Sequence, residues 1–402
     1  MSGKGSAPSP RAHKTLPLTL VVSLLVATLS HAATDAPTHT EIDPLEFEIG
    51  PSGKIKTMAM NAQGQLLCGV SWLGNNAKPE NVGPRDSIPP GSRGFGQGSE
   101  RIQADPYAGQ HQYAIKIIDT TTGNVINTWP MEDGLQPKMI HGCDDGTVYV
   151  AGGGFLAHFD QNGNRLEIIN TDEIYGEKAL ASGLCVGEAD GERFVFLALG
   201  TGNSLRATEA IYRFNRDLAD PDPREIIPRQ YGCCAHIDIE VRNGEFLVAE
   251  NSRHRVNRFT LDGKPIDTWG SRDRTAIEGF AACCNPCNTD FAADGALYTA
   301  ESGVGRVKKY SQEGEYLGFV GYVDTTKFDR GSRLAAQSCY IPVEVEPDGS
   351  RVYIMDVRAH FIRVLQADPN AAAPKSSSPS SSTSSSLSDN KEDSALDFFD
   401  KK

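Results

Sequence analysis

Six of the nine cysteines in this 402-residue chain lie in three short segments, and thiols so grouped can bind metals, form disulfides or carry redox chemistry. The segments are YGCCAH (231–236), CCNPC (283–287) and SCYIP (338–342). Each ends shortly before an Asn-Gly or Asp-Gly turn. His236 and Cys287 both lie eight residues before the turn glycine, and Cys234 and Cys339 both lie ten residues before it. The shared offsets predict that the three segments occupy equivalent places in the fold.

Three chemistries compete for these residues. Disulfides could join neighbouring segments, for example Cys233 or Cys234 to Cys283 or Cys284, with Cys339 as a further candidate. A bridge across a loop of this length would contribute on the order of 4 kcal/mol. Because nine is an odd number, at least one cysteine lacks an intrachain disulfide partner.

The second chemistry is metal binding, because Cys and His are the ligands that zinc and copper favour. The candidate ligands are His236, Cys234, Cys287, Cys284 and Cys339. The third is a redox pair with C-x-x-C spacing at residues 284–287, which we discount because it precedes a strand rather than opening a helix. The three interpretations can coexist, because one bridge leaves other thiols and His236 available.

A secondary pair of candidates is His141 and Cys143, which stand five and three residues before Gly146. They could face the same channel from the opposite side of a ring. A buried or turn-capping pair is the favoured interpretation. Cys68 and Cys185 fall in or beside apolar strands and are typical of core residues.

The elements that must position these residues follow a repeat. A turn glycine, usually after Asp or Asn, precedes a β-rich run at six places: Gly64, Gly146, Gly191, Gly244, Gly295 and Gly349. Each unit contains short alternating segments that predict four strands. Four strands repeated six times predict an all-β, six-bladed β-propeller. The first unit is long because a Pro/Gly-rich insertion, residues 73–112, interrupts it.

The last unit offers only two clear strands after Gly349, and the segment 45–49 (LEFEI) precedes the first unit without a partner of its own. We therefore expect an N-terminal strand to complete the last blade and close the ring, which avoids an exposed sheet edge. In a propeller, equivalent positions of successive blades surround one axis. The cysteine segments should then meet on one arc at the mouth of the central channel.

Units four and five, residues 249–263 (AENSRHRVNRFTLDG) and 300–314 (AESGVGRVKKYSQEG), resemble NHL-repeat propellers. The arginines that match the repeat are Arg255 and Arg306, which we expect to form structural ion pairs between blades. The resemblance is strong over residues 232–320 and weaker elsewhere. It implies a six-bladed ring with a binding surface on one face, and it does not imply one particular function.

The chain is also distantly similar to the propeller of peptidylglycine amidating lyase, which binds zinc through histidines in alternate blades. His236 occupies a comparable place here, but the other units carry Lys138, Cys287 and Ile341 there. The three-histidine set is therefore not reproduced, and the lyase activity is not implied.

Both chain ends predict segments outside the propeller. Residues 1–32 have a basic start, a short apolar run and small residues before Ala32, which predicts a secretory signal peptide and an exported protein, periplasmic or extracellular. A linker (33–44), the propeller (45–368) and a disordered Ser-rich acidic tail (369–402) follow. We expect no membrane span after cleavage. The net charge of −13 argues against a nucleic-acid partner.

The sequence thus predicts a monomeric binding module with a Cys/His site at the channel mouth for a small-molecule, metal or protein ligand. Two alternatives remain open: a metal-dependent lyase or hydrolase at the same site, and a disulfide-stapled scaffold for protein interactions. No common hydrolase, nucleotide or haem motif is present in the sequence to decide between them.

Overall fold

The computed structural model describes residues 36–371 apart from 80–105, 108, 133, 177–178, 190, 201–207, 220–222, 234–235, 282–283, 303–304, 324–339 and 358. The chain divides into a compact unit, Met1–Ala372, and a second unit, Ala373–Lys402, whose residues are not among those described. The predicted signal peptide, the predicted tail from residue 372 onward and most of the 73–112 insertion lie outside the described residues. Within the described part, no helix is long and apolar enough to cross a membrane.

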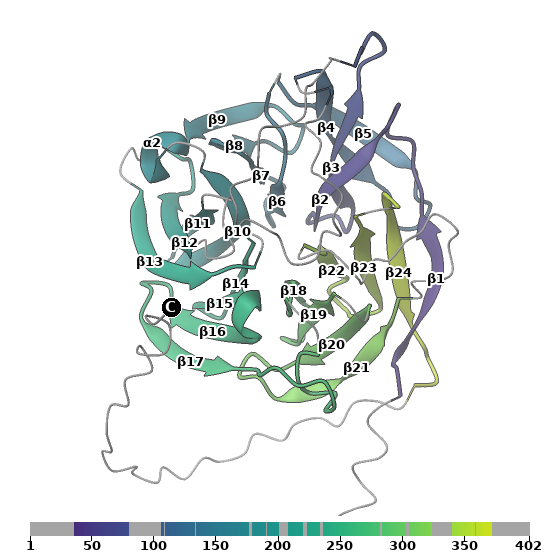
Figure 1. The fold of residues 1–402 in the computed structure, drawn as a ribbon, viewed down its shortest axis with the longest axis vertical. Helices are drawn as coiled ribbons and strands as arrows, with labels where there is room; N and C mark the ends of the chain where they lie inside the picture. The colour runs from purple at the N-terminus through teal and green to yellow at the C-terminus, as the bar shows by residue number, and fades with distance from the viewer. Residues whose placement is uncertain are drawn as a thin grey trace, which may run out of the picture. The chain divides into compact units, whose positions relative to one another are not determined.

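Six four-stranded antiparallel sheets surround a common axis, as the glycine repeat predicts (Figure 1). In each of the first three blades the strands follow one another from the axis outward. Blade 1 contains β2 (Lys54–Met60), β3 (Leu66–Leu73), β4 (His111–Ile118) and β5 (Val125–Pro130). Blade 2 contains β6 (Met139–Gly142), β7 (Val148–Ala151), β8 (Phe155–Phe159) and β9 (Arg165–Asn170). Blade 3 contains β10 (Leu180–Ala189), β11 (Glu192–Gly200), β12 (Thr208–Asn215) and β13 (Arg224–Tyr231).

The second half of the ring repeats this order, and its last blade borrows a strand from the N-terminus. Blade 4 contains β14 (Asp238–Arg242), β15 (Glu245–Glu250), β16 (Arg255–Thr260) and β17 (Pro265–Trp269). Blade 5 contains β18 (Asn288–Phe291), β19 (Leu297–Glu301), β20 (Arg306–Tyr310) and β21 (Tyr316–Tyr322). Blade 6 contains β22 (Val343–Val345), β23 (Arg351–Asp356), β24 (Phe361–Ala367) and β1 (His39–Leu45). The two short helical turns are α2 (Asp172–Tyr175) and η1 (Asn251–Arg253).

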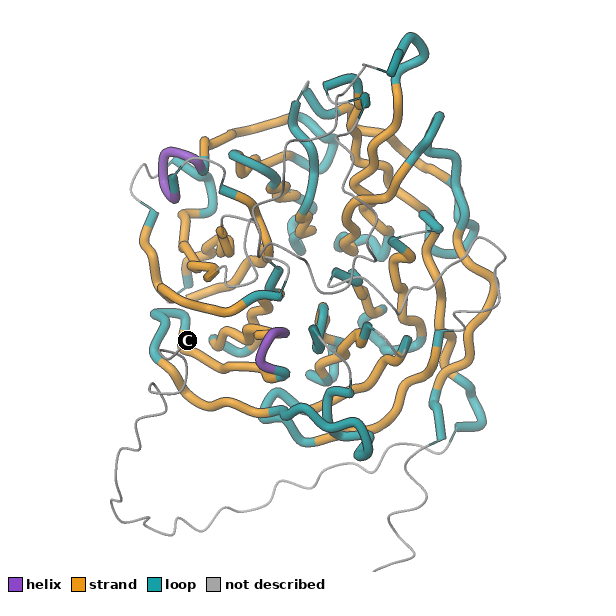
Figure 2. The backbone as a smooth tube through the Cα atoms, viewed as in Figure 1, coloured by secondary structure: helices purple, strands orange, loops and turns teal. Residues whose placement is uncertain are grey.

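The strands of each blade follow one another from the axis to the outer wall (Figure 2), and burial changes in that order. The second strands β7 and β19 are buried at every position, because neighbouring blades cover both of their faces. The fourth strands β5 and β17 are exposed at most positions, because they form the outer wall. Six apolar clusters of described residues fill the spaces between consecutive blades.

The turn glycines have the conformation that the repeat predicts. Between β14 and β15, Asn243 and Gly244 have φ angles of 51° and 75°, and Arg242 pairs directly with Glu245. A two-residue hairpin needs positive φ at both positions, which Asn and Gly adopt most readily. This hairpin connects the inner strand of blade 4, β14, to the second strand, β15.

The closure of the ring by an N-terminal strand is confirmed, but a different segment supplies it. The strand is His39–Leu45, which pairs antiparallel with β24, whereas the sequence pattern favoured 45–49. Glu41 of this strand meets the buried guanidinium of Arg363 at 2.9 Å. Phe47 and Ile49 instead pack against the cluster between blades 6 and 1. Apolar residues in the 45–49 segment thus reflect packing over this seam rather than strand pairing.

Candidate functional site

The segments that precede β14, β18 and β22 form the feature we call the rim, and two of its predicted cysteines come together there. Sγ of Cys233, before β14, lies 2.7 Å from Sγ of Cys284, before β18. The backbone N–H of Cys233 donates to Oδ1 of Asn251 at 2.7 Å. Cys284 is buried and Cys233 is half-buried. The expectation that equivalent segments of blades 4 and 5 meet is therefore met for this pair.

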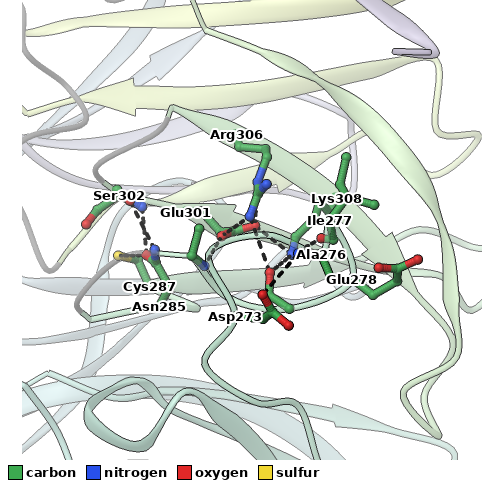
Figure 3. A network of polar contacts seen from close by, with 12 residues as sticks. Asp273, Ala276, Ile277, Glu278, Asn285, Cys287, Glu301, Ser302, Arg306 and Lys308 are labelled. Atoms are coloured by element: carbon green, nitrogen blue, oxygen red, sulfur yellow. Dashed lines mark hydrogen bonds and ion pairs between the residues drawn. The ribbon is translucent and has the colours of Figure 1, made fainter. Parts of the chain in front are cut away.

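Cys287, three residues after Cys284, is fully buried. Its thiol donates to the carbonyl of Cys284 at 3.0 Å. Burial raises the pKa of the Cys287 thiol to about 12, so it stays protonated at neutral pH. The adjacent Asn285 exchanges two hydrogen bonds with the backbone of Ser302, at 2.7 and 3.0 Å (Figure 3). These contacts fix the segment 284–288 against the end of β19.

A buried ion-pair network continues from this segment into blade 5 (Figure 3). Glu301 pairs with Arg306 at 2.9 Å and with Lys308 at 2.8 Å, and Nζ of Lys308 also donates to the carbonyls of Ile277 and Gly279. In blade 4, Arg255 pairs with Glu250 in the same way. The expected arginine ion pairs therefore form, but within one blade rather than between blades, because each partner sits on the paired strand of the same hairpin.

His236 does not join the described cysteines in a metal cluster. Its buried ring packs edge-on against Tyr340, with centroids 4.6 Å apart. The Tyr340 hydroxyl donates to Oγ1 of Thr57 at 2.7 Å and lies 3.2 Å from the carbonyl of Lys138. These four residues come from blades 4, 6, 1 and 2. Tyr340, which itself belongs to the rim segment before β22, therefore connects these blades across the ring.

Tyr340 also lines a cavity of about 520 Å³, to which all six inner strands or their adjoining turns contribute. Four carboxylates from three consecutive blades face it: Asp238 and Glu240 on β14, Asp290 on β18 and Glu344 on β22. Asp144 joins them from the turn after β6. None of the described cysteines lines this cavity.

Three of the carboxylates bind the inner strand of the next blade. Oδ2 of Asp238 accepts from the N–H of Thr289 at 2.6 Å, and Oδ2 of Asp290 accepts from the N–H of Val345 at 2.6 Å. Oε2 of Glu344 accepts from the N–H of Met60 at 2.9 Å. An inner strand has one edge without a strand partner, so each carboxylate satisfies an N–H group that would otherwise be buried without a partner. The acids are thus part of the ring's construction as well as its lining.

The burial of these acids raises their pKa values. Burial raises the pKa of Asp238 to about 6 and that of Asp290 to about 7. Burial, reinforced by the charges of the neighbouring acids, raises the pKa values of Glu240 and Glu344 well above their ordinary range. The cavity therefore holds protons near neutral pH that isolated carboxyl groups would release.

Two basic groups also line the cavity, and the charge of Arg242 lowers the pKa of Asp290 against the larger effect of burial. Arg242 donates from its guanidinium to the carbonyls of Ala292 and Ala293, at 3.0 and 2.7 Å. Burial lowers the pKa of His141 to about 4, so its imidazole is neutral at neutral pH. Of the secondary pair of candidates, His141 thus lines the cavity, whereas Cys143 is buried in the apolar cluster between blades 2 and 3.

The remaining rim candidates, Cys234, Cys283 and Cys339, lie outside the described residues. Among the residues that are described, no group of three or more His, Cys, Asp or Glu side chains could hold a metal ion. Zinc or copper at the rim thus stays a prediction. The inner-strand carboxylates were not among the expected site residues, although the sequence contains a signal for them. Each of these four stands four to six residues before a turn glycine: Asp238, Glu240, Asp290 and Glu344.

No family model matches this chain, and no curated protein matches it. Solved structures do match. A protein of unknown function from Bacteroides thetaiotaomicron shares 14% identity, with 84% of this chain and 74% of that chain covered and a TM-score of 0.49. A gluconolactonase from Xanthomonas campestris shares 11% identity, with coverage of 84% and 97% and a TM-score of 0.48. The calcium-binding protein regucalcin from Agrobacterium tumefaciens shares 11%, with coverage of 83% and 95% and a TM-score of 0.47.

Proposed function

We propose that this chain is an exported propeller of the NHL type that acts as a binding module, and that its ligand is a small organic cation held in the central cavity. The observation that carries the proposal is the cavity itself. It has a volume of about 520 Å³ and gathers four carboxylates, against which Arg242 is the only permanently charged basic side chain among the described lining residues. A volume of this size suits a small molecule.

An ammonium or guanidinium group fits this lining for two reasons. Its charge would offset the burial and the neighbouring negative charges that raise the pKa values of Glu240 and Glu344. Aromatic rings of Phe291 and Tyr340 also line the cavity, and the Arg242 guanidinium already lies over the Phe291 ring at 5.5 Å. A bare metal ion fits less well, because the described carboxylates do not form a metal-holding group. The proposed site is thus lined by residues of the inner strands and not by the described rim cysteines.

Binding should release protons, because a cation next to a carboxylate lowers its pKa. Isothermal titration calorimetry with 1,4-diaminobutane, choline and calcium chloride tests this. We expect at least one organic cation to bind at pH 7.5 with a heat that depends on the ionisation enthalpy of the buffer. The affinity should fall when the pH is lowered to 5, since protonated carboxyls no longer attract the cation.

The matched variants are Glu240→Gln in the cavity and Glu192→Gln at the exposed start of β11. The first should weaken binding about tenfold or more, which corresponds to about 1.4 kcal/mol, and the second should leave it unchanged. Equal affinities for the two variants would contradict the proposal. If calcium bound and neither organic cation did, the site would be a metal site and the proposal would be wrong.

A further inference from the structure

The boundary between blades 4 and 5 is packed differently from the others, with a small aliphatic cluster and a separate aromatic group of Trp269, Phe280 and Tyr310. Its cluster has three buried apolar residues, Leu247, Val256 and Leu297, whereas each of the other five clusters of described residues has eleven or more. Polar contacts cross this boundary instead, such as Thr289 to Asp238 and Arg242 to Ala292. A cross-link at this boundary would therefore supplement a small aliphatic cluster.

The two rim sulfurs lie at the same boundary. Sγ of Cys233 belongs to blade 4, Sγ of Cys284 belongs to blade 5, and 2.7 Å separates them. A disulfide bond measures about 2.05 Å. Two thiolates on one tetrahedral zinc, each bound at about 2.3 Å, would lie roughly 3.8 Å apart. The observed separation is closer to a covalent pair than to two ligands of one metal.

Both cysteines are anchored by the blade that carries them. The N–H of Cys233 donates to Asn251 at the end of β15. The carbonyl of Cys284 accepts from the thiol of Cys287, and Asn285 is held by Ser302 at the end of β19. Little movement of either backbone is needed to bring the sulfurs into bonding distance.

We propose that Cys233 and Cys284 form a disulfide that staples blade 4 to blade 5 at the rim, with Cys287 retained as a thiol. The two thiols give up two protons and two electrons, and a disulfide-bearing oxidant accepts the electrons and is reduced to two thiols. Cys287 stays reduced because its Sγ is buried and its S–H points at a carbonyl oxygen. This inference is independent of any ligand in the cavity.

The staple joins residues 51 positions apart, so it restricts the unfolded chain considerably. It also joins the two blades whose inner strands, β14 and β18, carry three of the four inner-strand carboxylates of the cavity. A rim held in this way is a rigid structural feature rather than a metal centre.

Peptide mapping of the full chain, purified without reductant and alkylated with iodoacetamide in denaturant, tests the proposal. Trypsin should release residues 230–242 joined to residues 275–306, with Cys287 alkylated. The link should persist in Cys234→Ser and Cys283→Ser, and it should vanish in Cys233→Ser and Cys284→Ser. These four variants distinguish adjacent cysteines that mass alone does not separate.

A thermal measurement provides a second readout. Reductant should lower the melting temperature of the unmodified chain by on the order of 5 °C more than that of the Cys233→Ser/Cys284→Ser double variant. Recovery of the two peptides separately, with Cys233 and Cys284 both alkylated, would overturn the inference. So would a link that survives in Cys233→Ser, because the bridge would then use Cys234.

Discussion

The hydroxyl of Tyr340, before the inner strand of blade 6, donates to Oγ1 of Thr57 on β2 of blade 1 at 2.7 Å. The same hydroxyl lies 3.2 Å from the carbonyl of Lys138 at the entrance to blade 2. A single side chain of the rim thus connects three blades and also lines the acid cavity, whereas none of the described cysteines lines that cavity. The two features that the chain offers for chemistry are therefore distinct.

Removal of this hydroxyl should destabilise the ring. In Tyr340→Phe the carbonyl of Lys138 and the hydroxyl of Thr57 both lose a partner, which should lower the free energy of unfolding by about 1–2 kcal/mol. Urea denaturation measures the change, and Thr57→Val completes a double-mutant cycle. A coupling free energy near zero between the two substitutions would show that the bond contributes nothing to stability.

The acid cluster should make stability fall as the pH rises. The pKa of Asp290 is raised to about 7 by burial, so the folded protein holds this proton more tightly than the unfolded chain does. The resulting stabilisation is fully present below about pH 4, the pKa of an unperturbed aspartate, and is lost as the pH rises through 7.

The free energy of unfolding of Asp290→Asn, taken relative to that of the unmodified chain, should therefore be higher at pH 7.5 than at pH 4.5 by about 1 kcal/mol or more. The amide oxygen can still accept from the N–H of Val345, which limits the structural change. Urea unfolding at both pH values measures the difference. Asp267→Asn on the exposed strand β17 is the matched control. An identical response in the two variants would contradict the pH assignment.

Lys308→Met should loosen the segment that precedes the rim of blade 5. Nζ of Lys308 donates to the carbonyls of Ile277 and Gly279 and pairs with Glu301, and methionine retains the volume without these bonds. We expect a loss of about 2–4 kcal/mol of stability. Trypsin should cleave faster after Arg272 and Arg274, which lie in the same segment.

The control for this variant is Lys264→Met at the exposed turn between β16 and β17. It removes a lysine of blade 4 without touching a buried partner. Cleavage rates after Arg272 and Arg274 that match between the two variants would show that Lys308 does not hold the segment.

Glu41→Ala should weaken the closure of the ring. Arg363 is fully buried between Glu41 on β1 and Asp356 on β23, at 2.9 and 3.0 Å. Loss of one partner leaves a buried charge only partly compensated, which should cost about 3 kcal/mol. Thermal unfolding measures this, with the exposed Glu48→Ala as control. Hydrogen exchange of β24 amides should increase only in the Glu41 variant.

The sequence alone determined the number of blades, because each hairpin needs a glycine at positive φ and that requirement is local. It also determined that the segments before β14 and β18 would meet, since equivalent positions of a repeat surround one axis. The contact between the sulfurs of Cys233 and Cys284 is a direct consequence.

The tertiary structure decided which residues surround the cavity and which strand closes the ring. Asp238, Asp290 and Glu344 look like ordinary polar positions of alternating strands, and only the convergence of three blades turns them into a cluster of acids with raised pKa values. The closing strand His39–Leu45 is selected by Glu41 meeting Arg363, residues 322 positions apart. Such long-range contacts depend on how the blades curve around the axis, which no local pattern of residues encodes.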